Sequence, residues 1–86
     1  MTQVGHLVHL LWNIPLRTLI SAVEKDGFSL KRETRTGGRI YAHPDGRIVL
    51  VHYHRSGANL TRKTLESVLR ATRWTEDDLK RLNLIR

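Results

Sequence analysis

The residues with the most chemical potential lie between positions 34 and 54, in the sequence TRTGGRIYAHPDGRIVLVHYH. This stretch holds three histidines, His43, His52 and His54, and the pair Gly37-Gly38. His52 and His54 share one face if the segment is a strand, because side chains alternate across a strand. A zinc site needs three or four ligands, and no third ligand is evident on that face. The histidines are therefore interpreted as polar or stacking groups, and no metal or other cofactor is predicted.

The same stretch offers neither a standard nucleophile nor a phosphate-binding loop. A Ser/His/Asp hydrolase has no nucleophile-elbow context here, and 86 residues leave little chain to form a pocket. The glycines of TGGR precede a strand rather than a helix, so they do not match a loop that cradles phosphate. From the residues alone, Gly37 and Gly38 are a turn or a bulge at the start of a strand.

Positive charge is concentrated in the middle third of the chain. The formal net charge is +7, from 15 basic and 8 acidic residues. Residues 28–63 contribute +6 of this charge, because eight basic residues there stand against only Glu33 and Asp45. The eight are Lys31, Arg32, Arg35, Arg39, Arg47, Arg55, Arg62 and Lys63. A concentrated basic patch is typical of proteins that bind a phosphate backbone; a solubilising surface is the alternative interpretation.

Length and composition indicate one small soluble domain. Eighty-six residues are near the lower limit for a chain that folds alone, and the chain has no cysteine for disulfides or thiolate metal sites. The N-terminal run HLVHLLW lacks the basic leading region and cleavage site of a signal peptide. No apolar run approaches the roughly 18 residues of a membrane span. We expect a cytoplasmic protein with no membrane partner.

Apolar residues at i, i+3, i+4 and i+7 predict two long helices, one on each side of this stretch. The first covers about residues 14–26 and ends at Gly27, which can adopt the left-handed C′ conformation. The second covers about residues 62–73. A short last helix begins after Thr75, which caps it together with Asp78. The apolar positions of the two long helices are Leu16, Leu19, Ile20, Val23, Leu65, Val68 and Leu69.

Three strands are predicted between the long helices. The segment FSLKRETR alternates apolar and polar residues, and RIYAH and RIVLVHYH are β-branched and aromatic runs joined by a PDG turn. With a three-residue loop, Gly38 pairs with His52 and Ile40 pairs with Leu50. One face of the hairpin then carries Gly38, Ile40, Ala42, Ile48, Leu50, His52 and His54. The other face carries Arg39, Tyr41, His43, Arg47, Val49, Val51 and Tyr53.

The predicted order α-β-β-β-α-α is that of a small two-layer α+β domain, with a three-stranded antiparallel sheet and the helices on one of its faces. The predicted core combines the apolar helix positions with Phe28, Leu30 and alternate positions of the hairpin. Because this core is modest, we expect a partner or a homodimer to add buried area. The apolar residues 7–14 are the expected contact surface.

Taken together, these segments resemble the HicA mRNA interferase toxins. The matching pieces are EKDGFSLKRE, GRIYAHPDGRIVLVHYH and LTRKTLESVLRATRWTEDDL, and IYAHPDGR in that position is fairly specific. The resemblance covers about residues 15–80. On this basis residues 14–86 form a single HicA-like domain, and residues 1–13 are an N-terminal extension outside the family match.

The resemblance implies a fold like the double-stranded-RNA-binding domain, cleavage of single-stranded mRNA without the ribosome, and neutralisation by a HicB-type antitoxin that covers the active site. With the modest core, the expected assembly is a homodimer or a toxin–antitoxin hetero-oligomer. Such cleavage needs no metal if a histidine takes the proton of the 2′-OH, which then attacks the adjacent phosphate. Basic side chains would hold the RNA backbone and offset the charge of the phosphorane. The residues expected to do so are Lys31, Arg32, Arg35, Arg39, Arg47, Arg62 and Lys63.

The chain departs from the family pattern at the catalytic position. Aligned on RIYAHP, the family triplet G-S-H or G-G-H lies on residues 36–38, so Gly38 stands where the resemblance places the catalytic histidine. Glycine has no group for acid–base chemistry. Three interpretations are open. In the first, the chain is an inactive relative or an engineered inactive form that still binds RNA and antitoxin. In the second, His52, which is inferred to face Gly38, replaces the catalytic histidine. In the third, the alignment is shifted and the active site consists of other residues.

Overall fold

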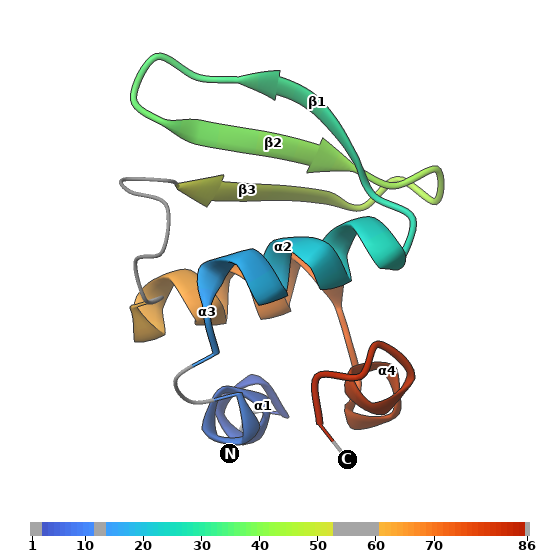
Figure 1. Cartoon of the computed structure of the whole chain (residues 1–86). Helices are drawn as coiled ribbons and strands as arrows, with labels where there is room; N and C mark the ends of the chain where they lie inside the picture. Colours follow the sequence, from blue (N-terminus) through green and yellow to red (C-terminus); the bar gives the residue numbers. More distant parts are fainter. Residues whose placement is uncertain (1–2, 12–13, 53–60, 86) are drawn as a thin grey trace.

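The computed structural model of the protein describes residues 3–11, 14–52 and 61–85. Its elements are α1 (Gln3–Leu10), α2 (Leu16–Lys25), β1 (Ser29–Glu33), β2 (Gly38–Ala42), β3 (Ile48–His52), α3 (Arg62–Thr72) and α4 (Glu76–Arg81). The strands form one antiparallel sheet in the order β1-β2-β3. In Figure 1 the helices lie on one side of this sheet, with α2 and α3 next to it. The predicted α+β architecture, similar to the double-stranded-RNA-binding domain, is confirmed.

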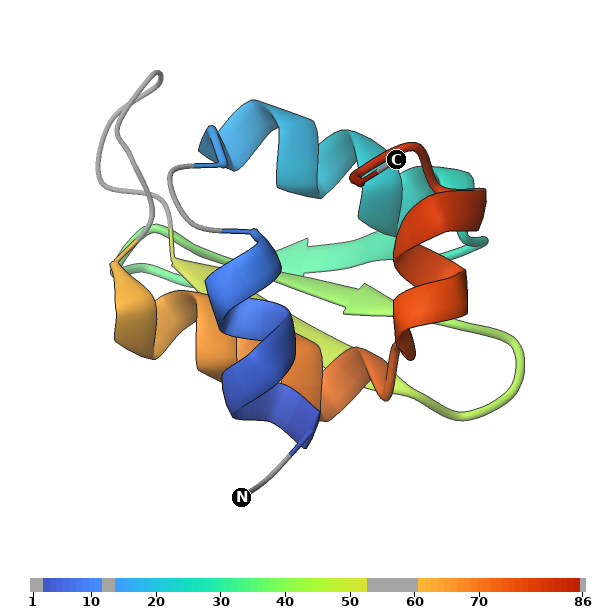
Figure 2. The same cartoon turned by 90° about the horizontal axis from the view of Figure 1, so that it is seen from below.

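The expectation that the apolar residues 7–14 contact a partner is wrong for the part of this segment that the structure describes. Leu7, Val8 and Leu11 are buried in the core of their own chain. They belong to or directly follow α1, an additional helix that the sequence analysis does not predict, and α1 contacts α3. Figures 1 and 2 show α1 and α4 on the side of α2 and α3 that faces away from the sheet. These two helices supply the buried area that a partner was expected to add.

The turn after α2 brings the chain from the helix into the sheet. Gly27 has φ +111° and donates its N–H to the carbonyl of Glu24 at 3.0 Å, while the N–H of Phe28 donates to the carbonyl of Val23 at 3.2 Å. This is a Schellman motif, and the predicted role of Gly27 is confirmed. A Cβ at Gly27 would lie 2.9 Å from Nε2 of His43. Both the positive φ and this close approach require glycine at the position.

The last helix begins as the sequence predicts. The Oγ1 of Thr75 accepts the N–H of Asp78 at 3.3 Å, and Oδ2 of Asp78 accepts the N–H of Thr75 at 2.9 Å. The two bonds form a capping box, which satisfies backbone donors at the start of α4. Trp74 and Leu79, on either side of the cap, are both buried. This cap therefore fixes the point at which the chain leaves α3 and enters α4.

The hairpin of β2 and β3 has the predicted register. The pairs include Gly38 with His52, Ile40 with Leu50 and Ala42 with Ile48. The N–H of His43 donates to the carbonyl of Arg47 at 2.9 Å, which closes the predicted three-residue loop. Tyr41, Val49 and Val51 face the helices and are at most 1 % exposed. The opposite face of the hairpin, which begins at Gly38 and ends at His52, is open.

Leu30 is not a core residue, contrary to the prediction. It pairs with the buried Tyr41 and so lies on the helix side of the sheet, but its side chain is 43 % exposed. The reason is that β1 is an edge strand, and Figure 1 shows it as the strand farthest from the helices. The pairing shifts between Leu30 and Arg32, which leaves Lys31 as a bulge. Arg32 therefore pairs with Ile40 and points to the open face.

A buried carboxylate joins the hairpin to the helices. The side chain of Asp26 is 5 % exposed, and its oxygens accept the Trp74 indole N–H at 2.9 Å and Arg81 Nη2 at 2.7 Å. Nη2 of Arg47 lies 3.2 Å from the same carboxylate. A buried charge is tolerated when opposite charges and hydrogen-bond donors satisfy it in this way. We call Asp26, Arg47, Trp74 and Arg81 the Asp26 cluster.

The segment HPDGR supplies the hairpin side of this cluster. Nη1 of Arg47 donates to the carbonyl of Thr72 at 2.6 Å, and Nε2 of His43 donates to the carbonyl of Asp26 at 2.9 Å. The ring of Phe28 lies between them, edge-to-face with His43 at 5.1 Å and under the guanidinium of Arg47 at 5.0 Å. The segment that most resembles a known family is therefore a structural element in this fold.

The contacts of Asp26 change its titration. Burial alone would raise the pKa of Asp26, but the hydrogen bonds from Trp74 and Arg81 and the charge of Arg47 outweigh it and lower the pKa below its ordinary value. Because the pKa of Asp26 is lower in the folded state than in the unfolded chain, its ionised carboxylate stabilises the fold fully above the unfolded pKa of about 3.9. This contribution to the free energy of unfolding is lost as the pH falls through the lower pKa of the folded state.

Asp26→Asn removes the buried charge at nearly constant size. We expect the free energy of unfolding at pH 7 to fall by about 2 kcal/mol, because Arg47 and Arg81 lose their shared counter-charge. The variant should also lose less stability than the wild type between pH 5 and pH 3. Urea denaturation at pH 7, 5 and 3 measures both effects. Glu24→Gln, which changes an exposed carboxylate of the same helix, should cost less than about 0.5 kcal/mol. A stability of Asp26→Asn equal to that of the wild type would contradict the role of the cluster.

Candidate functional site

Thr34, Gly38 and His52 meet at one end of the open face of the sheet. Gly38 pairs with His52 across the two strands of the hairpin. The N–H of Gly38 donates to Oγ1 of Thr34 at 2.9 Å, and the N–H of Thr34 donates to the carbonyl of Gly38 at 2.8 Å. The β1–β2 turn with Arg35 and the start of α3 lie at the same end of the molecule (Figures 1 and 2). We call this region the Gly38 end.

The space beside Gly38 is partly filled by its neighbours. A Cβ at this position would lie 2.8 Å from Oγ1 of Thr34, 3.1 Å from Cδ1 of Leu50 and 3.5 Å from Nδ1 of His52. The φ of Gly38 is not positive, so the backbone itself does not require glycine. The constraint is space, because the Thr34 hydroxyl stands where a side chain would begin. The lack of a side chain at Gly38 therefore leaves room for the Thr34 hydroxyl, which accepts the Gly38 N–H.

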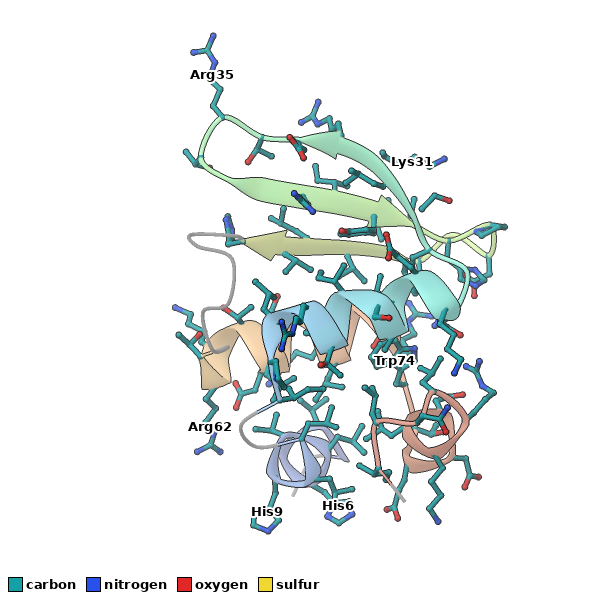
Figure 3. All side chains as sticks on the ribbon, in the orientation of Figure 1. His6, His9, Lys31, Arg35, Arg62 and Trp74 are labelled. Carbon is teal, nitrogen blue, oxygen red and sulfur yellow. The ribbon has the colours of Figure 1, made fainter. Side chains whose placement is uncertain are left out.

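His52 supplies an imidazole at the Gly38 end. Its side chain is exposed on the open face, as the predicted register requires. The ring of His43 is engaged in the hairpin turn, where Nδ1 accepts the N–H of Asp45 at 3.1 Å. His6 and His9 lie on α1, on the far side of the helices (Figure 3). His54 lies outside the described residues.

Four of the predicted RNA-binding residues lie at or near this end with exposed side chains. Arg35 projects from the β1–β2 turn, and Arg62 projects from the start of α3 on the side away from the sheet (Figure 3). Lys63 follows Arg62 at the same helix start. Arg32 lies on the open face of β1. These cations flank the Gly38 end from the sheet side and from the helix side.

The structure does not bring the other three predicted RNA-binding residues into this site. Lys31 stands at the bulge in the middle of β1, and its side chain projects away from Arg35 (Figure 3). Arg39 lies on the helix side of the sheet, where its Nε is 3.3 Å from Oε1 of Glu33. Arg47 belongs to the Asp26 cluster at the opposite end of the hairpin. Arg39 and Arg47 therefore neutralise carboxylates of their own chain.

The parts of the chain that the structure describes contain no group of three or more His, Asp or Glu side chains arranged to hold a metal ion. No helix in the same residues is long and apolar enough to cross a membrane.

A three-stranded antiparallel sheet with helices on one face defines the class of small α+β domains similar to the double-stranded-RNA-binding domain. Within this class, the family model described as HicA toxin of bacterial toxin–antitoxin matches residues 16–74, which are 59 of the 86 residues. The chain belongs to the HicA toxin family. The match runs from the first residue of α2 to Trp74, so α1 and α4 lie outside it. No curated protein matches the chain.

Thr34 is a residue of this site that no motif in the sequence identifies. The only signal is a threonine four residues before a glycine in a short strand connection. That spacing does not identify a contact, because the Thr34 hydroxyl reaches the Gly38 amide only in the particular conformation of this turn. The arrangement makes the two positions interdependent.

Gly38→Ala tests this dependence. The added Cβ meets Oγ1 of Thr34, which costs about 1–3 kcal/mol, while the reduced entropy of the unfolded chain returns about 0.4–1 kcal/mol. We expect a net loss of about 1 kcal/mol in the free energy of unfolding. In a Thr34→Ala background the same change should be neutral or stabilising. Urea denaturation of the four proteins gives the coupling energy, and additive effects would show that the close contact does not matter.

Proposed function

We propose that this chain is the toxin of a type II toxin–antitoxin pair that binds and cleaves single-stranded mRNA at the Gly38 end, with His52 as the acid–base group. The observation that supports this proposal is the position of His52. Its Nδ1 lies 3.5 Å from the Cβ position of Gly38, the residue that stands where the family resemblance assigns a catalytic histidine. A HicB-type antitoxin is the proposed partner, and the cytoplasm is the proposed place of action.

An exposed imidazole has the chemistry that RNA cleavage requires. Histidine changes its charge between about pH 5 and 8, so it can both take and return a proton near neutral pH. His52 would take the proton of a 2′-OH, whose oxygen attacks the adjacent phosphorus. The P–O bond to the 5′-oxygen then breaks, and that oxygen takes a proton from the imidazolium or from water. The products are a 2′,3′-cyclic phosphate and a 5′-OH.

Arg35, Arg62 and Lys63 are the proposed contacts to the RNA backbone. They are exposed, they flank the Gly38 end, and they carry part of the +6 charge of residues 28–63. Contacts of this kind release counterions from the nucleic acid, so they supply affinity that falls as salt rises.

A toxin-family chain that binds RNA or antitoxin without cleaving RNA is the second candidate. Two observations favour it. Gly38 carries no titratable group, and the hydroxyl of Thr34 occupies the space where a side chain at that position would begin.

RNA cleavage by purified protein separates the two candidates. We expect the wild type to cut single-stranded RNA in the presence of a chelator, and His52→Ala to cut it about 10²–10⁴-fold more slowly. His9→Ala, which changes an exposed histidine of α1, is the matched control and should be as active as the wild type. If only Gly38→His cleaves RNA while the wild type does not, the second candidate is correct. Undiminished cleavage by His52→Ala would rule out His52 as the acid–base group.

Binding of a single-stranded oligonucleotide with 2′-O-methyl groups, which cannot be cleaved, measures the backbone contacts. We expect Arg35→Gln and Arg62→Gln each to weaken binding in low salt and each to reduce the slope of log K against log salt by about 0.7. Lys80→Gln removes an exposed charge from α4 and should leave both quantities nearly unchanged. Equal effects of all three substitutions would mean that the chain attracts RNA only through its net charge.

A further inference from the structure

The turn between β1 and β2 fixes the side chain of Thr34. The N–H of Thr34 donates to the carbonyl of Gly38 at 2.8 Å, and the N–H of Gly37 donates to the carbonyl of Thr34 at 3.3 Å. The N–H of Gly38 donates to Oγ1 of Thr34 at 2.9 Å. These hydrogen bonds hold both the backbone and the hydroxyl of Thr34, which is half-buried. The hydroxyl therefore has a defined position beside Gly38.

The Thr34 hydroxyl and the His52 imidazole lie close to the same point. A Cβ at Gly38 would be 2.8 Å from Oγ1 of Thr34 and 3.5 Å from Nδ1 of His52. The third atom near this point is Cδ1 of Leu50, at 3.1 Å, and it cannot form hydrogen bonds. Because Gly38 has no side chain, a ligand can approach the backbone closely at this position. A phosphodiester that does so meets a hydroxyl and an imidazole together.

The Thr34 hydroxyl binds the Gly38 N–H through an oxygen lone pair and keeps its own proton as a donor. A threonine hydroxyl has one O–H donor and two acceptor lone pairs. Among the described residues, its other hydrogen-bond partner is Oγ1 of Thr36 at 3.4 Å, where either hydroxyl can be the donor. This distance is long for an O–H···O bond, which usually measures about 2.5–3.0 Å. The proton can therefore turn to a closer acceptor. The bond from the Gly38 N–H strengthens that donation, because hydrogen bonds in a chain polarise one another.

We propose that Thr34 is a second catalytic residue of the RNA cleavage, and that its hydroxyl donates a hydrogen bond to a non-bridging oxygen of the scissile phosphate. The inference rests on the proposed function and deepens it. His52 takes the proton of the 2′-OH, the 2′-oxygen bonds to phosphorus, and the bond from phosphorus to the 5′-oxygen breaks. Thr34 transfers no proton in this step. Its hydrogen bond offsets the negative charge that develops on the phosphorane oxygens.

The same contact thus explains two properties of the site. The Thr34 hydroxyl leaves little room for a side chain at residue 38, and it supplies a polar group at the place from which that side chain is absent. A hydroxyl cannot act as the general base at neutral pH, so it complements His52 rather than replacing it.

Thr34→Val and Thr34→Ser separate the hydroxyl from the shape of the side chain. Valine keeps the shape and removes the hydroxyl, whereas serine keeps the hydroxyl. Cleavage of single-stranded RNA is measured with saturating protein in the presence of a chelator. We expect Thr34→Val to cut about 10²-fold more slowly and Thr34→Ser to stay within about 3-fold of the wild type. The Kd for RNA with 2′-O-methyl groups should change by less than about 3-fold in both variants, because the contact forms in the transition state. Thr36→Val, which removes an exposed hydroxyl of the same turn, is the matched control and should cut at the wild-type rate.

A phosphorothioate substrate distinguishes direct contact from support of the turn. Sulfur in place of a non-bridging oxygen is a weaker hydrogen-bond acceptor. We expect the wild type to cut one of the two diastereomers about 10-fold more slowly than the all-oxygen RNA. Thr34→Val should cut that diastereomer and the all-oxygen RNA at equal rates, because the contact is already lost. A residue that only supports the turn would slow both substrates by the same factor.

Each other outcome contradicts a defined claim. If the wild type cleaves no RNA, the proposed function fails and the role of Thr34 fails with it. If Thr34→Val cleaves as fast as the wild type while His52→Ala is slow, the proposed function stands and the role of Thr34 is wrong. A slow Thr34→Val that keeps the phosphorothioate effect of the wild type would make Thr34 a structural residue. Circular dichroism verifies that each variant is folded, and Thr34→Ala replaces Thr34→Val if the latter is not.

Discussion

The structure depends on the hydrogen bonds and ion pairs of one buried carboxylate. Asp26 accepts hydrogen bonds from Trp74 and Arg81, and Arg47 of the hairpin lies beside it. These partners come from separate segments, so neutralising Asp26 fixes the hairpin turn against the end of α2 and against Trp74 and the end of α4. The turn sets the register of β2 and β3, and the register decides which side chains reach the open face. Gly38 and His52 meet at the far end of the same two strands. The candidate site is therefore positioned by a contact at the opposite end of the sheet.

The hairpin shows how much of the fold the sequence can predict. The PDG turn and the alternation of residues are local signals, and the register that they predict is confirmed. Which face the helices cover is not a local property, because both faces of the hairpin carry apolar residues. Leu30 is exposed and Leu7 is buried for the same reason, since cover by a helix depends on where the other elements pack. An apolar residue shows in the sequence that it can be buried, and only the tertiary arrangement decides whether it is.

The candidate site likewise combines a contact that the sequence predicts with one that it does not. The approach of His52 to Gly38 follows from strand register, so the sequence predicts it. The Thr34 hydroxyl reaches the Gly38 amide through the conformation of a turn, and no pattern of residue types encodes that contact. Among the basic residues, Arg47 and Arg35 are equivalent in the sequence, but one neutralises a buried carboxylate and the other projects into solvent. Net charge alone does not separate cations that stabilise the fold from cations that are free to bind a ligand.

The central claim is that RNA binds at the Gly38 end of the molecule. NMR titration with a single-stranded RNA that carries 2′-O-methyl groups tests this claim most directly. Changes in backbone amide chemical shifts report on all segments of the chain in one experiment. The account predicts the largest shifts in residues 34–39, at His52 and in residues 62–64. Shifts centred on α4 or on the hairpin turn at residues 44–47, or no shifts at all, would contradict it.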